Sequence, residues 1–552
     1  MSTRRDDREG ADLGERLRTA LAAWTELLGP AHVLVDPAVL ARYGSTTLPA
    51  ADRPVAAVLR PDTRDGVAAC VRIAGKYKVP LYPVSTGRNW GYGDACPPTP
   101  GQVIIDLSRM NRVVELDPRL AYVVIEPGVT QGQLAQLLAE QRTGLWLDCT
   151  GAGPDVSIVG NVLERGFGHT AYGDRFRHVC GLEVVLADGN VLRTGFGHYG
   201  NARAARVFPY GIGPVLDGLF TQSNFGIVTQ LGLWLMPKPR RSELFFCQIR
   251  DHADLAPAID ALRDLRLDGT LRSVVHIGND LRLISSRPAG GIGAEQVPLT
   301  VAARKSVREG ERIAAWSMSG SLTGSGAQVR AARAAVRRAL RGPGRRLLFL
   351  GERKLRLAEF ATRLLGGESG GKLRQLVAAA RAVADLNTGR PTGHFLSGAY
   401  WRRRGGVPAR FPAGLDPARD RCGLIWLSPV LPMTGAAALE LHDAIEPIYQ
   451  AHGFHPLITL STINERALSA VMTVAYDKED PGETQRAREC YRALWDALAA
   501  AGFMPYRAGI QSMADLARNS TGFWPVTRRI KAALDPDGII APGRYDPLQF
   551  DD

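Results

Sequence analysis

A strand that breaks into a glycine-rich loop, residues 79–97 (VPLYPVSTGRNWGYGDACP), most constrains the fold of this chain. A strand is predicted earlier at 55–61. Between the two, residues 63–77 carry apolar side chains at helical spacing after a Thr/Asp cap. This strand-helix-strand unit predicts that the loop lies at the edge of a sheet, where ligands bind in such folds.

The loop presents backbone N–H groups with little side-chain obstruction, which is the arrangement that cradles a pyrophosphate. It has neither the GxGxxG order of a Rossmann site nor the lysine of a Walker loop, so NAD and nucleoside triphosphates are disfavoured. A plain connection remains the alternative. A second glycine-rich stretch at 153–174 favours a ligand site, because one extended dinucleotide needs two such surfaces.

Composition narrows the class of protein further. The chain has 552 residues, of which 45% are hydrophobic, and this predicts two or more packed domains. Its seven cysteines are scattered without a CxxC pair, which predicts a reducing compartment, no disulfide framework and no metal site. The sequence shows neither an apolar leader nor a run of about 18 apolar residues, so we expect a cytoplasmic protein with no membrane partner.

The formal net charge of +13 is spread along the chain, and its densest basic run is 330–357. Basic residues among alanines at helical spacing are typical of a solvated helix face, and a docking patch for an acidic partner is the alternative. Because no aromatic-interleaved basic platform accompanies the charge, we expect no nucleic-acid partner.

The rest of the chain divides at Pro239. Before it, residues 180–195 predict a hairpin turning at Asp188-Gly189, and 226–239 predict a strand. After it, strand-like runs alternate with Ala/Arg-rich helices up to about residue 500, which indicates a second domain with a helix-covered sheet. The expected helices span 326–340, 372–386, 435–452 and 482–501. The tail at 526–547 predicts a helix that stops at Asp535-Pro536.

Motifs distributed along the chain resemble the vanillyl-alcohol oxidase and p-cresol methylhydroxylase family of FAD enzymes. They include GRNWGYG, IEPGVTQGQL, VGNVLERGFGHTAYGD, GLEVVLADGNVLRTG, MPYR and DPDGIIAPGR. The resemblance covers about residues 40–545. It implies an α+β protein with a PCMH-type FAD-binding domain formed by both chain ends, 1–239 and 501–552. A cap domain at 240–500 would carry a helix-covered antiparallel sheet.

The resemblance implies FAD contacts in three segments and at one arginine. These are Ser85, Thr86, Gly87, Arg88, Asn89, Trp90, Gly91 and Tyr92; Gly160, Asn161, Gly166, Tyr172, Gly173 and Asp174; Gly226, Ile227 and Val228; and Arg544. The first segment would wrap the pyrophosphate. Leu424 stands where many relatives attach the flavin to a histidine, so FAD is predicted to be bound without a covalent bond, with nearby Cys422 read as an inert thiol.

The catalytic residues implied by the resemblance are Tyr92, Tyr506 and Arg507, which would bind a substrate phenolate. Two phenol donors and a guanidinium stabilise the anion, and the anion promotes departure of a benzylic hydride to flavin N5. Arg544 would stabilise charge on the reduced flavin. Leu460 and Ser469 replace the acid and the histidine that activate water in hydroxylating relatives, which disfavours hydroxylation.

Five further residues are candidates for the substrate pocket: Asp155, His169, Tyr400, Trp401 and Leu424. The resemblance thus implies an FAD-dependent oxidase or dehydrogenase of a para-substituted phenol, with a role in specialised metabolism. Its electron acceptor would be molecular oxygen or a protein, and it would be a homodimer. Two alternatives stay open. One is oxidation of a non-phenolic alcohol, hydroxy acid or amine-bearing substrate. The other is a weakly catalytic flavin-binding partner protein that uses the basic segment 330–357.

Overall fold

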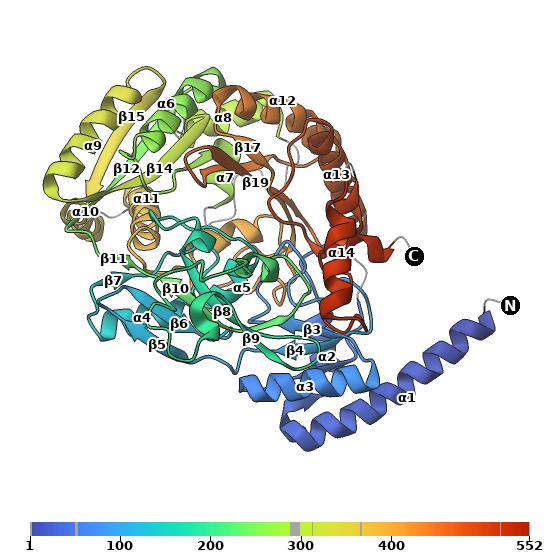
Figure 1. Cartoon of the computed structure of the whole chain (residues 1–552). Coiled ribbons are helices and arrows are strands. Elements are labelled where there is room, and N and C mark those ends of the chain that lie inside the picture. Colours follow the sequence, from blue (N-terminus) through green and yellow to red (C-terminus); the bar gives the residue numbers. More distant parts are fainter. Residues whose placement is uncertain are drawn as a thin grey trace.

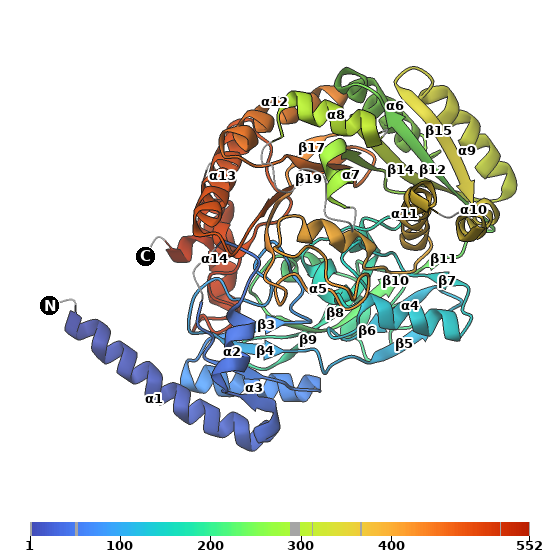
Figure 2. The same cartoon turned by 180° about the vertical axis from the view of Figure 1, so that it is seen from behind.

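The computed structural model describes residues 3–49, 53–286, 299–311, 313–364, 367–518 and 520–550, and it confirms an α+β fold. Strands of the described residues form four sheets. Figures 1 and 2 show the largest sheet and its helices in the upper half of the molecule, above two sheets built from the first 240 residues.

The first sheet contains the predicted strand-helix-strand unit. Its strands are β1 (Val33–Leu34), β2 (Ala57–Leu59), β4 (Val103–Asp106) and β3 (Leu81–Val84), in that spatial order. Helix α3 (Arg64–Tyr77) begins at Thr63, whose side chain accepts a hydrogen bond from the backbone of Gly66. Both β2 and β3 run parallel to β4, which lies between them and was not predicted. Near the C-terminus, Ile540 forms a parallel bridge with Leu81 of β3.

The second sheet has the order β5 (Val113–Asp117), β6 (Tyr122–Ile125), β10 (Ile227–Trp234), β8 (Val179–Val185) and β9 (Val191–Arg193). The predicted hairpin is confirmed as β8 and β9, and Gly189 in its turn has a φ of 78°, which glycine adopts without strain. Helices α4 (Gln131–Glu140) and α5 (Ile158–Leu163) follow β6, and β7 (Leu145–Trp146) pairs with β11 (Met236–Pro237).

The third large sheet is antiparallel and contains eight strands. They are β15 (Gly344–Gly351), β12 (Arg241–Ile249), β14 (Trp316–Gly324), β13 (His276–Asn279), β18 (Leu457–Thr462), β19 (Ala467–Tyr476) and β16 (Gly423–Leu427), with β17 (Val430–Pro432) paired to β19. Helices cover its outer face, as predicted (Figure 1). They are α6 (Leu255–Leu267), α9 (Gly326–Ala339), α12 (Gly435–Ala451) and α13 (Pro481–Ala500).

The basic run 330–357 is not one helix. Helix α9 ends at Ala339, β15 follows, and α10 (Glu352–Leu364) begins after it. The glycines in RGPGRR end the helix, and the apolar RLLFL that follows joins the sheet as an edge strand. The remaining helices are α1 (Thr3–Leu28), α2 (Pro37–Gly44), α7 (Asp280–Ser285), α8 (Val301–Glu311), α11 (Gly367–Leu386) and α14 (Phe523–Leu534).

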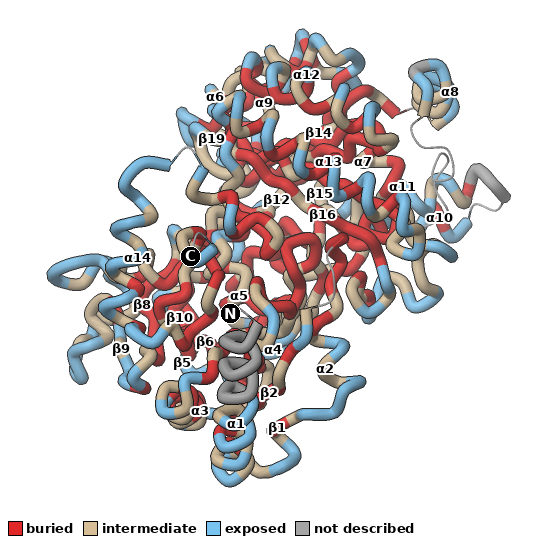
Figure 3. The backbone as a smooth tube through the Cα atoms, turned by 90° about the vertical axis from the view of Figure 1, so that its right-hand side faces the viewer, coloured by how far each residue is buried: buried red, intermediate tan, exposed pale blue. Residues whose placement is uncertain are grey.

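Buried residues follow the sheets and the helix faces that pack on them (Figure 3). The largest cluster lies between the eight-stranded sheet and its outer helices and includes Phe245, Trp316 and Tyr449. All seven cysteines lie in the described residues, where they are buried and form no disulfide. Within the described ranges, no helix combines the length and the apolar character needed to cross a membrane.

Candidate functional site

A cavity of about 1700 Å³ is lined both by the sheets of the first 240 residues and by the inner face of the eight-stranded sheet. Pockets for ordinary small molecules have volumes of about 300–1000 Å³, so this one has room for a longer ligand. Residues from the C-terminal segment, among them Tyr506 and Arg544, also line it. The cavity is thus formed by parts of the chain that are far apart in sequence.

The first glycine-rich loop forms one wall of this cavity. The backbone N–H groups of Thr86, Gly87 and Arg88 donate no hydrogen bond to any residue that the structure describes. The second stretch lies against it, since the backbone N–H of Ser157 donates to Oγ1 of Thr86 (3.2 Å). A Cβ atom at Gly160 would lie 3.2 Å from Oγ of Ser85. The two glycine-rich stretches therefore form one continuous surface with free backbone donors.

Glu164 organises two buried arginines at the cavity. Its Oε1 accepts a hydrogen bond from Nη2 of Arg544 (2.5 Å), and its Oε2 accepts one from the hydroxyl of Tyr545 (2.8 Å). Nη2 of Arg507 lies 3.6 Å from Oε2 and also donates to Oδ1 of Asn89. Burial alone would raise the pKa of Glu164, but the two guanidinium groups hold that pKa below its ordinary value.

The arginines retain donors that are available to a ligand. Nε of Arg507 and Nη1 of Arg544 are buried and have no hydrogen-bond partner among the described residues. Two guanidinium groups share one carboxylate, so the pair keeps an excess positive charge inside the protein. A ligand rich in phosphate and carbonyl oxygens satisfies these donors and the bare loop, and FAD has this chemistry. The residues present therefore fit FAD.

Tyr92 and Arg507 are in direct contact at the same wall. The guanidinium carbon of Arg507 lies 4.0 Å from the centroid of the Tyr92 ring, and the Tyr92 hydroxyl lies 2.7 Å from Oγ of Ser428. Burial raises the pKa of Tyr92 well above its ordinary value, so its hydroxyl stays protonated. Tyr506 contacts Phe167 with ring centroids 5.8 Å apart. The structure brings the predicted tyrosines and arginine together at one cavity.

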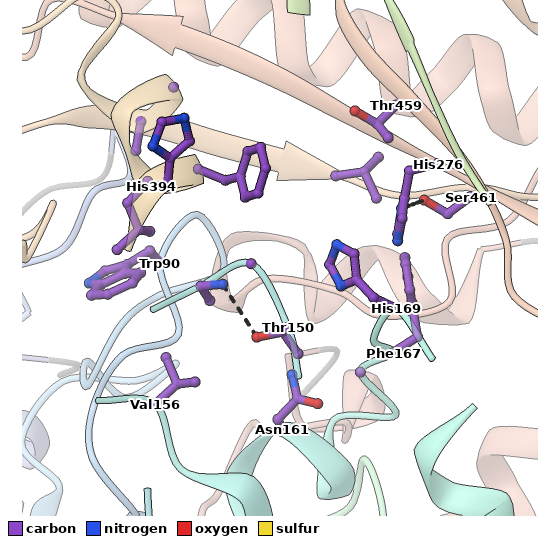
Figure 4. A pocket seen from close by; sticks show the side chains of 18 of the residues that line it. Trp90, Thr150, Val156, Asn161, Phe167, His169, His276, His394, Thr459 and Ser461 are labelled. Atoms are coloured by element: carbon purple, nitrogen blue, oxygen red, sulfur yellow. Dashed lines mark hydrogen bonds between the residues drawn. The ribbon is translucent and has the colours of Figure 1, made fainter. Parts of the chain in front are cut away.

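Two histidines form a second group on the cavity wall (Figure 4). The rings of His169 and His276 have centroids 4.2 Å apart. Nδ1 of His276 lies 2.9 Å from Oγ of Ser461, and Nδ1 of His169 donates to the carbonyl of Cys149 (3.0 Å). Burial lowers the pKa of both imidazoles, His276 the more strongly, so both are neutral near pH 7. They offer uncharged nitrogen atoms to a ligand.

Most of the sequence-predicted site residues line this cavity. They are Ser85, Thr86, Gly87, Arg88, Asn89, Trp90, Tyr92, Gly160, Asn161, Gly166, His169, Gly226, Ile227, Val228, Leu424, Tyr506, Arg507 and Arg544. The others are Gly91, Asp155, Tyr172, Gly173, Asp174, Tyr400 and Trp401, which are not part of its lining. The loop and the C-terminal segment thus reach the cavity, while the two cap aromatics do not.

Packing accounts for several of these exclusions. Tyr172 stacks on His178 with ring centroids 3.9 Å apart, and Trp401 packs in an apolar cluster of the cap. The hydroxyl of Tyr400 donates to Asp420 (2.6 Å). The side chain of Asp155 is 49% exposed and faces Arg88. Tyr400 and Trp401 are therefore packed in the protein core and do not form part of the cavity wall.

The positions discussed for covalent attachment and hydroxylation carry little reactive chemistry. Leu424 lines the cavity with an inert side chain, and Cys422 is fully buried next to it, where burial raises the pKa of its thiol. Leu460 belongs to the apolar core. Ser469 is the second position at which hydroxylating relatives carry a water-activating residue. It is buried and pairs in register with Ser461 of the adjacent strand.

Sequence reasoning missed four residues of the site: Glu164, His276, Arg282 and Ser428. Glu164 lies within a quoted motif, and a buried acid next to glycines was a usable signal. His276 lies on β13 and Arg282 on α7, the helix that directly follows this strand, and no local sequence pattern identifies either residue as part of a site. Away from the cavity, His252, His442 and Asp443 have potential metal-ligand atoms within 4.8 Å of one another. The sequence analysis did not identify this group, because it predicted no metal site.

Comparisons with known proteins agree with this geometry. A family model for an FAD binding domain matches residues 55–195. The chain is 42% identical to 1'-carboxy-chondrochloren decarboxylase of Chondromyces crocatus, over 96% of this chain and 97% of that protein. It is 31% identical to the flavoprotein subunit of 4-cresol dehydrogenase (hydroxylating) of Pseudomonas putida, over 97% and 96%. The crystal structure of p-cresol methylhydroxylase with substrate bound matches with a TM-score of 0.86 at 30% identity, over 96% and 97%.

The fold and the cavity thus define an FAD-dependent oxidoreductase, an enzyme of the oxidase or dehydrogenase type. More narrowly, the chain belongs to the vanillyl-alcohol oxidase and p-cresol methylhydroxylase family of flavoproteins.

Proposed function

We propose that this enzyme oxidises a para-substituted phenol. The observation that carries the proposal is the contact between Arg507 and Tyr92. A buried guanidinium, whose Nε has no hydrogen-bond partner among the described residues, lies over the ring of a tyrosine with a protonated hydroxyl. Together with Tyr506, these groups can bind one oxygen anion. A guanidinium and two hydroxyl donors lower the pKa of a bound phenol and favour its anion.

The residues of the site have separable roles in this reaction. Arg507, Tyr92 and Tyr506 hold the phenolate, whose electrons then promote loss of a hydride from the benzylic carbon of the para substituent. FAD, when bound, supplies the hydride acceptor. Glu164 positions Arg507 and Arg544 through its two oxygens. We assign the FAD contacts to the predicted residues that line the cavity, and the bare N–H groups of 86–88 to its pyrophosphate.

Several properties of the whole protein belong to the same proposal. We assign residues 1–239 and 501–552 to an FAD-binding domain and 240–500 to a cap. FAD is bound without a covalent bond, because Leu424 offers no nucleophile. The protein is a cytoplasmic homodimer that passes electrons to molecular oxygen or to an acceptor protein.

Anaerobic addition of para-alkylphenols tests the reaction. We expect 4-ethylphenol or a larger homologue to bleach the flavin absorbance near 450 nm, whereas phenol, which has no benzylic carbon, leaves it unchanged. Bleaching by simple alcohols or hydroxy acids, with no response to any alkylphenol, would instead support the non-phenolic alternative.

A second candidate function is oxidation coupled to loss of a carboxyl group. It is favoured by the 42% identity to a protein named as a decarboxylase. Hydride loss from the benzylic carbon would leave a quinone methide. Cleavage of the neighbouring C–CO2⁻ bond would then return its electron pair to the ring, giving an alkenyl phenolate and CO2. The step consumes no water, so it needs no side chain that activates water. Product mass distinguishes it from hydroxylation.

A further inference from the structure

Arg282 places a guanidinium at the cap side of the cavity. Helix α7 begins directly after β13, and Oδ1 of Asn279 accepts a hydrogen bond from the backbone N–H of Arg282 (2.9 Å), which fixes the first turn. The Arg282 side chain lines the cavity. A Cβ atom at Gly398 would lie 2.7 Å from Nη1 of Arg282, so the guanidinium packs directly against residue 398 of the segment 394–400 and would have to shift if that residue had a side chain.

Among the described residues, the guanidinium of Arg282 has no acidic partner. It makes no hydrogen bond or ion pair with any residue that the structure describes. The acid nearest to it in sequence, Asp280, is bound by Arg304 at 2.7 Å. Burial lowers the pKa of Arg282 to about 10, so the group remains charged at neutral pH. A charge that is removed from water without a partner is costly, and proteins rarely retain one without a ligand to bind.

The other arginines of the cavity differ from Arg282 in this respect. Arg88 lies 3.7 Å from both Asp155 and Asp416. Arg507 and Arg544 share Glu164. Arg346 also lines the cavity but is exposed to solvent, which screens its charge. Arg282 therefore combines partial burial, charge and the absence of a partner among the residues that the structure describes.

We propose that Arg282 binds a carboxylate of the substrate. The planar guanidinium pairs with a carboxylate through two parallel hydrogen bonds, which gives orientation as well as affinity. The substrate class is then a phenol whose para side chain ends in a carboxylate, with the phenolate at Arg507 and the carboxylate at Arg282. The inference rests on the proposed function and sharpens it. A carboxylate on the para side chain is also what the decarboxylation described above consumes.

The test compares two ligands of the same shape. The acid 3-(4-hydroxyphenyl)propanoate and its amide differ only in charge at the end of the side chain. Their Kd values are measured by anaerobic calorimetry on enzyme whose FAD has first been reduced with dithionite, so that neither ligand is oxidised. We expect the wild type to prefer the acid by at least ten-fold, Arg282→Met to abolish the preference, and Arg282→Lys to retain part of it. Arg346→Met is the matched control and should leave the ratio of the two Kd values unchanged.

Each other outcome is informative. An unchanged ratio in Arg282→Met overturns the inference while leaving the phenol reaction intact. Loss of FAD from both Arg282 variants, measured by flavin absorbance per protein, overturns it too and assigns Arg282 to the cofactor. If neither phenol binds the wild type, the proposed function fails. In that case, non-phenolic carboxylates of the same length and their amides are titrated against the same variants. If Arg282→Met leaves the ratio of acid to amide Kd values unchanged for these ligands too, the role of Arg282 is overturned.

Discussion

At the scale of single residues, charge balance explains most of the site. Glu164 is one carboxylate between two guanidinium groups and one hydroxyl, so its neighbourhood stays positive. That arrangement suits an electron-rich ligand, because positive groups that are already in place need no reorganisation when negative charge develops. Arg507 is the member of this network that also contacts Tyr92, which makes it the most informative residue to replace.

Replacing Arg507 should slow flavin reduction more than removing either hydroxyl. Charged hydrogen bonds contribute about 1.5 to 3 kcal/mol and neutral ones about 1 kcal/mol. Because about 1.4 kcal/mol equals a factor of ten, Arg507→Ala should cost roughly ten-fold to a hundred-fold in the anaerobic reduction rate. Tyr92→Phe and Tyr506→Phe should each cost less. If all three variants retain FAD and reduce it at the wild-type rate, the phenol must bind elsewhere in the cavity.

The buried His276 should make the protein less stable in acid. Its pKa in the folded protein lies well below the ordinary value near 6.5, so the unfolded chain takes up a proton first. Its contribution to stability is therefore complete above pH 6.5 and is lost as the pH falls from there toward the folded pKa. His276→Gln should reduce the fall in Tm between pH 7 and pH 5, whatever its effect at pH 7. The same fall in Tm between pH 7 and pH 5 for the wild type and His276→Gln would contradict this prediction.

At the scale of elements, the first glycine-rich loop is held by the cap sheet as well as by its own strand. Gly91 donates its N–H to Oγ1 of Thr47 (2.8 Å), and its carbonyl accepts from the backbone of Trp426 in β16 (3.1 Å). A Cβ atom at this position would lie 2.8 Å from the Trp426 ring. Gly91 is thus required for close approach of the two segments, although it does not line the cavity.

A pair of glycine variants separates this close approach from backbone strain. Gly91 has a φ of 74° and Gly101 a φ of 78°, but nothing lies within 4 Å of a Cβ atom at Gly101. Both Gly→Ala changes should cost about 1–2 kcal/mol for the left-handed conformation. Gly91→Ala should cost about 1–3 kcal/mol more, because it overpacks against Trp426, and it should weaken FAD binding. Urea unfolding and flavin content measure both effects, and equal losses would contradict the role of Trp426.

Sequence patterns predicted the helices and turns whose formation depends on residues close together in the chain. Helix α3 with its Thr63 cap and the hairpin at Asp188-Gly189 depend on neighbouring residues, and both are confirmed. Strand β4 is four buried residues with no alternation, so periodicity could not identify it. Arg282 reaches the cavity of Tyr506 only through pairing of the eight-stranded sheet, and such long-range pairing leaves no signal in one sequence. The motif resemblance located most of the rest.

At the scale of the whole molecule, the C-terminal segment completes the first sheet. The backbone N–H of Leu81 donates to the carbonyl of Ile539 (2.8 Å), and that of Ala541 donates to the carbonyl of Leu81 (2.7 Å). Lys531 of α14 donates to the carbonyls of Asn224 (2.6 Å) and Ile540 (2.8 Å). These bonds place Arg544 beside Glu164, so the cavity depends on a segment more than 400 residues beyond β3.

Truncation should therefore abolish cofactor binding well before it removes the cap. A chain that ends at Leu534 lacks Ile540, Arg544 and Tyr545, and we expect it to bind no FAD. A chain that ends at Asp546 keeps all three and serves as the control, which should stay yellow. FAD binding by both truncated chains is measured as flavin absorbance after incubation with FAD, and circular dichroism checks that both chains are folded. Full FAD binding by the shorter chain would contradict this role of the segment.

The bridge between Leu81 and Ile540 also bears on how the protein is made. A ribosome adds about 5–20 residues per second, so roughly 20 to 90 seconds separate synthesis of the glycine-rich loop from synthesis of its C-terminal partner. During that interval the nascent chain exposes one edge of β3 and one half of the future cavity. The flavin can enter only after translation of this segment, and a chaperone that shields the unpaired β3 edge until then would raise the yield of holoenzyme.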